Sequence, residues 1–410
     1  MGNLEAQRRL GRQACHVGPG VVRRVTSSTV SHGRSLSLHS MLYIHAADWT
    51  AGTRTRWPAA ARRRPTDTPR RSTMHEWPSE QPVDATIPVI DAHHHLVGRG
   101  RDFLVHTTGK PVFLVDDYAD FVGSTHNVIA SVAVEMHSMY RAGGPHELRS
   151  VNETVFLDGQ AAMSATGLYG DVHIAAGIVA GVELQTDAVQ RALQAHLVAA
   201  PERLRGVRQS GFWDADPAVA ARLFGLPRNF YLDEEFRRGV GLLVPLGLSF
   251  DAMVLSPQLP DVLDLARSFP ELSIVLNHLG NPVGIGSHAT TVEEDFAEWR
   301  VHMAKIAECE NVTVKMGGLG TFLSGSPNYL RTPPADSTTL AEEWRSWTEE
   351  TIGLFGADRV MFESNAPSDC VGPFATVCNA YQRITAGCSE DERRAIFAGT
   401  AARVYRLDLV

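Results

Sequence analysis

The sequence predicts an α/β fold, a (β/α)8 TIM barrel preceded by a disordered basic leader. Short apolar segments alternate with amphipathic, helix-like segments from residue 88 onward, and eight such apolar segments can be counted. Strands of a parallel sheet are buried on both faces and read as continuous apolar runs, as residues 273–276 do. An abrupt change in charge precedes the first strand and marks the end of the leader.

The predicted strands cover residues 88–95, 128–137, 172–183, 204–210, 248–254, 272–279, 312–317 and 359–365. Helices are predicted between most of them, at 186–199, 260–268, 292–308 and 340–355. Pro201 and Pro270 follow two of these helices, where a residue without a backbone N–H ends a helix. A further helix over 390–406 is expected to pack on the outside of the barrel.

Residues 1–73 form a leader whose composition differs from that of the barrel, which we assign to residues 74–410. The leader carries thirteen Arg, no Lys and three acidic residues, a net charge of +10, in a chain whose formal net charge is −8. The barrel must therefore carry −18. Arg-rich, Ser-rich and acid-poor composition is typical of disordered transit peptides, but we favour Met74 as the true start, with the leader as translated upstream sequence.

Composition also limits the partners and the compartment. Five cysteines without a Cys-x-x-Cys pair predict neither a disulfide framework nor a zinc ribbon, and they suit the cytoplasm. No apolar run reaches the ~18 residues of a membrane span, and an acidic barrel argues against nucleic-acid binding. We expect a cytoplasmic protein with a small-molecule substrate. The sequence does not determine the oligomeric state, for which a homodimer is one option.

The first strand ends in a His-x-His pair, His93 and His95, which is half of a metal site. Side chains alternate along a strand, so Asp91, His93 and His95 are predicted to share one face while His94 takes the other. Imidazole is the commonest ligand of catalytic zinc and iron. The pair therefore predicts two ligands of one ion.

Other strands also end in polar side chains, where a barrel carries its chemistry. These are Glu135 and His137, Glu183, Arg208 and Gln209, Asn277 and His278, Lys315, and finally Glu363 and Asn365. We predict His278 as a metal ligand. Glu135 and Glu363 are each expected to be a ligand or a salt-bridge partner of Arg208 or Lys315, because a carboxylate in an apolar strand is costly without a cation. Arg208 could instead clamp a substrate carboxylate.

Five motifs follow one another in a fixed order along the chain. They are Asp-Ala-His-His-His-Leu from Asp91, Leu-Arg-Gly-Val-Arg from Leu204, Asn-His-Leu-Gly from Asn277, Lys-Met-Gly-Gly-Leu from Lys315 and Met-Phe-Glu-Ser-Asn-Ala-Pro from Met361. In this series the chain resembles the amidohydrolase superfamily over residues 88–405, specifically the amidohydrolase-related (amidohydrolase 2) branch of metal-dependent TIM-barrel hydrolases. That branch includes sugar lactonases and decarboxylases. The resemblance implies that an acid on the eighth strand activates water.

The chain departs from that pattern at three positions. Asn365 occupies the place of the water-activating Asp, and an amide cannot serve as a general base. Gln209 and Ser256 stand where relatives of this branch often carry His. Simple hydrolysis by the usual residues is therefore not the only option.

The first functional hypothesis is a metal-dependent hydrolase. One divalent ion, zinc or manganese, bound by the first-strand pair and His278 would activate water to attack a lactone, amide or ester-type carbonyl. The substrate would be a small organic acid or a specialised metabolite. Glu363 would act as ligand or base, and Arg208 or Lys315 would hold the substrate or the developing oxyanion.

Two alternatives stay open. In the first, the histidines with Glu135, Glu183 and Glu363 bind one or two iron ions, as in a non-haem diiron monooxygenase acting on a coenzyme A-linked natural-product intermediate. The altered strand-eight residues favour this alternative. In the second, the protein is a metal-free lactonase or a non-catalytic barrel, although polar side chains at the barrel mouth are costly without a function.

Overall fold

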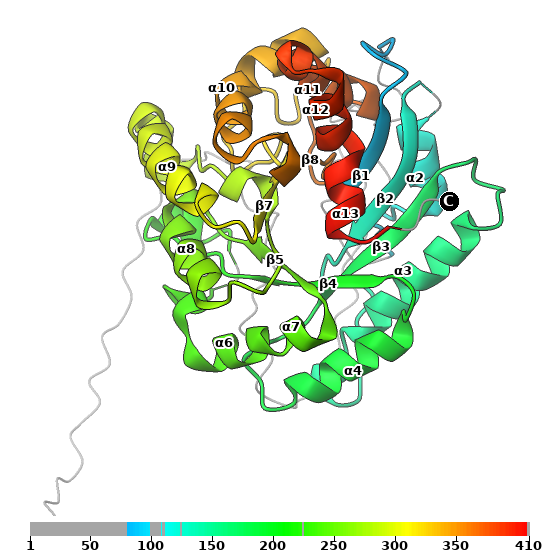
Figure 1. The fold of residues 1–410 in the computed structure, drawn as a ribbon, viewed down its shortest axis with the longest axis vertical. Helices are drawn as coiled ribbons and strands as arrows, with labels where there is room; N and C mark the ends of the chain where they lie inside the picture. The colour runs from blue at the N-terminus through cyan, green and yellow to red at the C-terminus, as the bar shows by residue number, and fades with distance from the viewer. Residues whose placement is uncertain (1–79, 99–107, 109–110, 124, 224, 408–410) are drawn as a thin grey trace, which may run out of the picture. The chain divides into compact units, whose positions relative to one another are not determined.

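The computed structural model describes residues 80–98, 108, 111–123, 125–223 and 225–407. Eight strands follow one another in a single parallel sheet in chain order, which confirms the predicted barrel (Figure 1). Their bounds are β1 Pro88–His94, β2 Asn127–Val134, β3 His173–Gly181, β4 Leu204–Ser210, β5 Ser249–Met253, β6 Ile274–Leu276, β7 Val312–Met316 and β8 Val360–Phe362. The predicted leader, residues 1–73, lies outside the described residues.

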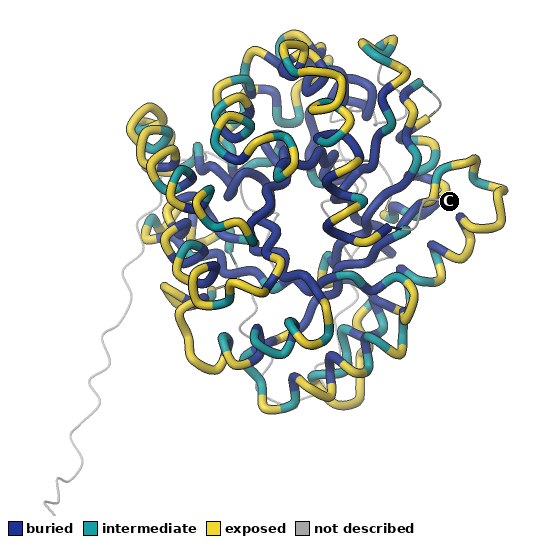
Figure 2. Tube along the Cα trace, in the orientation of Figure 1, coloured by how far each residue is buried: buried dark blue, intermediate teal, exposed yellow. Residues whose placement is uncertain are grey.

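Helices surround the strands and cover the outer face of the sheet (Figure 2). The longer ones are α2 Val115–Val122, α3 Val151–Ser164, α4 Val189–Ala199, α6 Glu234–Gly241, α8 Leu259–Ser268, α9 Val292–Ala307, α10 Ser337–Phe355 and α11 Phe374–Ile384. Local signals start several of them: the side chains of Asp233 and Asp336 accept hydrogen bonds from N–H groups in the first turns of α6 and α10. In the described part of the chain, no helix combines the length and the apolar character needed to cross a membrane.

The barrel closes between β1 and the main chain that follows β8. The N–H of His95 donates to the carbonyl of Ala366 (2.7 Å), and the N–H of Asn365 donates to the carbonyl of His93 (2.9 Å). These bonds join the first and last strands at their C-terminal ends. The eighth-strand residues of interest are thereby held directly beside the histidine pair.

Seven of the eight strands are shorter than predicted, β6 and β8 most of all. β6 ends at Leu276, and residues 277–280 form a 3-10 turn in which His278 has φ 56° and ψ 40°. β8 ends at Phe362, and Asn365 has φ 50°. In both places the backbone leaves the parallel sheet early, and polar side chains turn toward the barrel mouth. Strand periodicity alone does not predict this change of direction.

The C-terminal segment is helical over residues 390–404, as predicted, but it packs against the strand starts and not on the outside of the barrel. It forms three short helical elements, α12 Glu390–Arg394, a π-helical turn Ala395–Gly399 and α13 Thr400–Val404. The hydroxyl of Thr400 donates to the carbonyl of Ala357, just before β8. The segment therefore lies against the strand starts and seals the lower end of the barrel, because the barrel interior exposes apolar side chains there that need cover.

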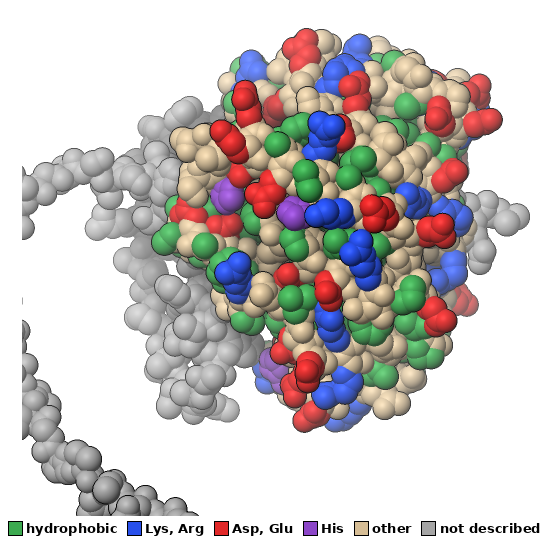
Figure 3. All heavy atoms as spheres, turned by 60° about the vertical axis from the view of Figure 1, so that its left-hand side comes forward, with side chains coloured by type: hydrophobic (Ala, Val, Ile, Leu, Met, Phe, Trp, Pro, Cys, Tyr) green, Lys and Arg blue, Asp and Glu red, His purple; other side chains and the backbone are tan. Residues whose placement is uncertain are grey.

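Three apolar clusters result from this arrangement, and the two larger ones form the core of the barrel. The larger of these two lies between the sheet and the surrounding helices. The smaller of the two fills the lower part of the barrel, where interior side chains pack against the C-terminal segment: Ile90, Val132, Val179, Val275 and Met361 with Ala398, Ala401, Val404 and Tyr405. On the face shown in Figure 3, acidic and basic side chains are interspersed.

Candidate active site

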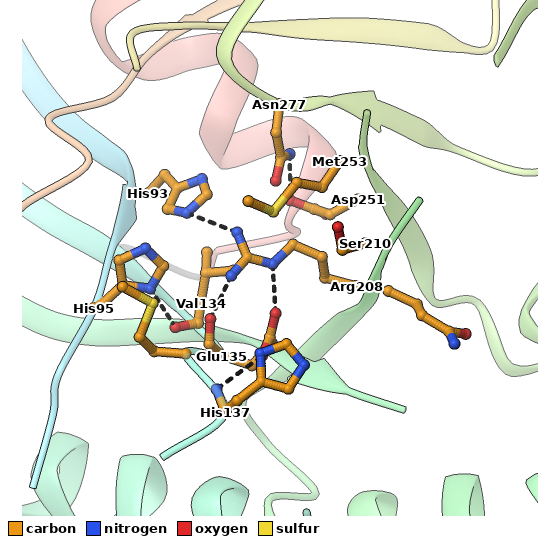
Figure 4. A network of polar contacts seen from close by, with 12 residues as sticks. His93, His95, Val134, Glu135, His137, Arg208, Ser210, Asp251, Met253 and Asn277 are labelled. Atoms are coloured by element: carbon orange, nitrogen blue, oxygen red, sulfur yellow. Dashed lines mark hydrogen bonds and ion pairs between the residues drawn. The ribbon is translucent and has the colours of Figure 1, made fainter. Parts of the chain in front are cut away.

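The histidine pair of β1 lies where that strand ends, and both rings face the barrel interior. The ring centroids of His93 and His95 are 4.9 Å apart (Figure 4). The register of β1 against β2 shifts between Asp91 and His94, so the strand does not alternate strictly. Asp91 accepts a hydrogen bond from the hydroxyl of Tyr118 on α2 (2.9 Å). The prediction that Asp91 shares the face of the two histidines is therefore wrong, because an irregularity breaks the period of two.

Three buried side chains from different strand ends bring their ligand atoms together: His93, His278 and Glu363. These atoms all lie within 4.8 Å of one another. His278 Nδ1 is 2.6 Å from Glu363 Oε1, and His93 Nδ1 is 3.0 Å from Glu363 Oε2. The second contact lacks the alignment of a hydrogen bond, so Oε2 accepts none although it is buried. Two imidazoles and a carboxylate form a donor set that suits zinc or iron.

Two glycines make room for this cluster. A Cβ atom at Gly317 would lie 2.2 Å from Glu363 Cγ, and one at Gly318 would lie 2.4 Å from His278 Cβ. Gly318 also has φ 73°, in the left-handed region that favours glycine. The Gly-Gly step that follows β7 is therefore required by the close approach of the eighth-strand carboxylate and the sixth-strand imidazole.

His95 is oriented by a main-chain contact. Its Nδ1 lies 2.9 Å from the carbonyl oxygen of Val134. A carbonyl can only accept, so Nδ1 carries the hydrogen and Nε2 keeps its lone pair. Metal-binding histidines commonly donate their other N–H to such a carbonyl. His95 thus has the tautomer of a ligand and lies beside the three-residue cluster.

Burial sets the charge states of these groups. It lowers the pKa of His93 and His278 well below the usual range, and that of His95 to about 3. Nearby Lys315 and Arg208 add to this effect. Burial raises the pKa of Glu363 to about 8. The imidazoles are therefore neutral, with lone pairs available. Burial outweighs the opposing charges of Lys315 and Arg208 at Glu363, so that its carboxyl holds a proton up to about pH 8.

Arg208 is held by Glu135 (Figure 4). Arg208 Nε donates to Glu135 Oε1 (2.7 Å), and a second nitrogen donates to the Glu135 carbonyl. Burial alone would raise the pKa of Glu135, but the charges of His137 and Arg208 outweigh it and lower that pKa to about 2. Glu135 is thus the salt-bridge partner that the sequence offered as one of its two roles. Arg208 Nη1 lies 3.2 Å from Nε2 of His93, so the guanidinium faces the cluster.

Lys315 pairs with a carboxylate that sequence reasoning missed. Its Nζ lies 2.7 Å from Oδ2 of Asp251 on β5, and both side chains are fully buried. The same Nζ lies 3.3 Å from Nδ1 of His93. A charged residue inside the apolar run of residues 250–254 was the signal that could have identified Asp251. The barrel interior thus holds two matched ion pairs, Arg208–Glu135 and Lys315–Asp251.

Two predicted residues do not contribute a side chain to the cluster. The side chain of Glu183 is 49% exposed and lies 3.5 Å from His146, away from the buried ligands. Asn365 directs its Nδ2 to Asp369 Oδ1 (2.7 Å), while its Oδ1 accepts no hydrogen bond. Burial raises the pKa of Asp369 to about 8. The position expected to hold a general base therefore carries an amide oriented by a neighbouring carboxyl group.

Comparison with known proteins places the barrel among relatives. The Amidohydrolase family model matches residues 90–407. The chain is similar to the uncharacterized protein y4mH of Sinorhizobium fredii, 30% identical over 343 residues, 78% of this chain and 99% of the relative. It is 29% identical over 170 residues to an L-fucono-1,5-lactonase of Burkholderia ambifaria, 39% of this chain and 51% of that relative.

Among solved structures, the chain resembles an amidohydrolase from Burkholderia multivorans. One crystal form of that protein contains bound zinc and matches with a TM-score of 0.58 and 25% identity, over 78% of this chain and 99% of the other. A second form, with bound HEPES, matches with a TM-score of 0.59. The fold, the order of the strand-end motifs and the family match over most of the chain agree, and this chain belongs to the amidohydrolase family of enzymes.

Proposed function

We propose that this protein hydrolyses a lactone, or a related ester- or amide-type carbonyl of a small organic acid, with one divalent cation bound by His93, His278 and Glu363. The observation that carries the proposal is the convergence of these three ligand atoms within 4.8 Å in a fully buried position. His95 adds a neutral imidazole with a free Nε2 beside them. The cluster provides the three protein donors typical of a catalytic zinc site, and His95 is a further nitrogen donor beside it.

The relatives support the reaction class and the metal separately. The curated relatives of known name are L-fucono-1,5-lactonases, of which the chain spans about half. The Burkholderia multivorans amidohydrolase, similar over almost its full length, has been crystallised with zinc. The first comparison supports a lactone as substrate and the second supports a bound divalent cation.

The charges of the interior also support a bound cation. Glu135 and Asp251 each have their own cationic partner, Arg208 and Lys315. Among the described residues Glu363 makes no ion pair with Lys or Arg, although the charges of Lys315 and Arg208 reach it, and its Oε2 accepts no hydrogen bond. A buried carboxylate without a partner is costly. A divalent ion beside Glu363 would supply the missing positive charge.

Each polar side chain of the barrel interior then has a role in the proposed reaction. A bound divalent ion would polarise a carbonyl oxygen and lower the pKa of water. Arg208, fixed by Glu135 on one side, presents Nη1 toward the cluster and is placed to hold a substrate carboxylate or a developing oxyanion. Lys315 stabilises negative charge from the opposite side of His93. Because Asn365 cannot accept a proton, Glu363 would serve both as a ligand of the ion and as the group that accepts a proton from water.

The geometry favours a single ion over the diiron alternative. Glu135 is engaged by Arg208, and Glu183 lies at the surface, so neither carboxylate contributes to the cluster. A metal-free lactonase stays a second candidate for a specific reason. Arg208 and Lys315 lie 3.2 and 3.3 Å from the two nitrogens of His93, and two cations so close disfavour a third.

The proposal is tested by Glu363→Gln, with Glu183→Gln as the matched control. Both change a carboxylate to an amide at a strand end, but only Glu363 belongs to the cluster. We expect Glu363→Gln to lose bound metal and more than about 100-fold in lactone hydrolysis, since even outer-shell changes at metal sites cost 10–100-fold. Glu183→Gln should match the wild type in both measurements.

The measurements are metal content by plasma mass spectrometry and hydrolysis of a panel of aldonolactones and aromatic lactones, with folding checked by circular dichroism. Metal and activity retained in Glu363→Gln would contradict the proposal. Lactone hydrolysis by a wild type that holds no metal and gains nothing from added zinc or manganese would favour the metal-free candidate. Metal loss in Glu183→Gln would favour the diiron alternative, in which Glu183 is a metal ligand.

A further inference from the structure

Lys315 is an unusual residue in this chain. Of 38 Lys and Arg residues only three are lysines, at positions 110, 305 and 315. Lys305 is exposed on α9, whereas Lys315 is fully buried inside the barrel. A flexible ammonium group in such a place needs neighbours that fix its direction, because each of its three N–H bonds must find a partner.

Asp251 accepts a hydrogen bond from this ammonium group and also from two other side chains. Asp251 Oδ2 accepts from Lys315 Nζ (2.7 Å), from Asn277 Nδ2 (3.1 Å) and from the hydroxyl of Tyr405 (2.9 Å). All four side chains are fully buried. Figure 4 shows the Asn277–Asp251 part of this network close to His93. Three donors on one oxygen leave the carboxylate little freedom to rotate.

Tyr405 reaches this network from the other end of the barrel. It follows α13, in the segment that seals the strand starts. Two contacts anchor the residues just after it: Arg205 Nε donates to the Arg406 carbonyl (3.3 Å), and the Leu407 N–H donates to the Ala402 carbonyl (2.9 Å). The Lys315 ammonium lies 5.3 Å from the centre of the Tyr405 ring, within cation–π range. Tyr405 thus contacts Lys315 through its ring and through Asp251.

We propose that Tyr405 is a positioning residue for the active site: its hydroxyl, through Asp251, fixes the Lys315 ammonium beside His93. The C-terminal segment then completes the site from below, in addition to closing the barrel. Burial raises the pKa of the Tyr405 hydroxyl well above its usual range, so the group is a neutral donor at all relevant pH values. The task of Lys315 in hydrolysis rests on the proposed function, but the position of its ammonium does not.

The chain offers a matched pair of substitutions. Tyr405→Phe keeps the ring, its packing and its contact with the ammonium, and removes only the donor to Asp251. Tyr381→Phe makes the same change at another buried tyrosine, whose hydroxyl has no hydrogen-bond partner. Asp251→Asn is a second route to the same effect, since it removes the charge that holds Lys315 and keeps the shape.

The first readout does not depend on activity. In full-length protein labelled with ¹⁵N at lysine Nζ, only three ammonium signals can arise, and the Lys315 signal is identified by its loss in Lys315→Arg. We expect this signal to be protected from exchange with water in the wild type. In Tyr405→Phe, exchange should rise about tenfold, the amount expected for the loss of one hydrogen bond to a charged group. Asp251→Asn should raise it further.

The second readout is kinetic. On any lactone that the wild type hydrolyses, Tyr405→Phe should lower kcat about tenfold and change KM less than twofold, because Lys315 acts on developing charge. Tyr381→Phe should match the wild type in exchange and in kcat. The inference is overturned if the wild type shows no protected lysine signal, or if Tyr405→Phe leaves its exchange unchanged. An exchange effect in a protein without lactonase activity would uphold the inference and count against the proposed function alone.

Discussion

The barrel interior has a lower part at the strand starts and an upper part at the strand ends. The two parts are built from the same strands but differ in polarity and in charge. Below, Val132, Val275 and Met361 pack against the C-terminal segment in an apolar layer. Above, just past the end of β8, Glu363 lies among imidazoles and two ion pairs. The apolar layer excludes water from below, and charges act over short distances more strongly where water is excluded. The residues that mainly stabilise the barrel and the residues proposed to carry out the reaction therefore lie at opposite ends of the same strands.

The largest effect on stability is expected where the two layers meet, at Lys315. Replacing it by Met leaves Asp251 buried without its cation, and breaking a buried pair in this way costs about 3–5 kcal/mol. Urea unfolding would measure the change, with Lys305→Met as control, since that lysine is exposed. A Lys315→Met protein as stable as the wild type would contradict this expectation, and would show that the other hydrogen-bond donors to Asp251 compensate for the lost ammonium group.

A smaller effect is expected in the apolar layer. Val132→Ala removes two buried methyl groups and should lower the free energy of unfolding by about 2 kcal/mol. Catalytic turnover per folded molecule should stay within about twofold, because no polar contact of the site changes. Val301→Ala, at a half-exposed position on α9, is the control and should cost less than about 0.5 kcal/mol. A large loss of turnover in Val132→Ala would contradict the claim that the apolar layer contributes to stability and not to catalysis.

The smallest effect is expected at the rim, outside both layers. His288 lies between Asp295 (2.9 Å) and Asp214 (3.2 Å), and so joins α9 to the loop after β4. Burial alone would lower the pKa of His288, but the hydrogen bonds and charges of the two aspartates outweigh it and raise that pKa. A raised pKa means that the folded state holds the proton more tightly than the unfolded state does.

This stabilisation is therefore complete below the unfolded pKa of about 6.5 and is lost as the pH rises through the higher folded value. His288→Gln should destabilise the protein by about 0.5 kcal/mol near pH 5.5 and by less near pH 9, given that such partly exposed pairs contribute little. Urea unfolding at both pH values tests this. An equal loss at both would assign the effect to packing instead of charge.

Much of the fold and part of the site could be predicted from the sequence. The eight strands were recognisable because buried parallel strands are continuous apolar runs, and the polar residues at their ends pointed to His93, His278 and Glu363. For Glu135, the cost of an unpaired buried charge left two roles open, metal ligand or salt-bridge partner, and the structure shows the pair with Arg208. These inferences use only the local pattern and the rule that strand ends meet at one face.

Other features depend on contacts that no local pattern encodes. Asp251 and Tyr405 are 154 residues apart and meet only because the C-terminal segment turns under the barrel. An amphipathic segment there predicts a helix but not which surface it covers. The register shift after Asp91 is likewise set by pairing with β2 and by closure against Ala366. Strict alternation therefore failed at the strand that carries the histidine pair.

The central claim is that the buried cluster of the upper layer holds one divalent cation. Its most direct test is the metal-to-chain ratio of the full-length protein, measured by plasma mass spectrometry after purification without added metal and again after incubation with zinc or manganese followed by desalting. We predict about one ion per chain. A ratio near zero under both conditions, or close to two irons per chain, would contradict the account.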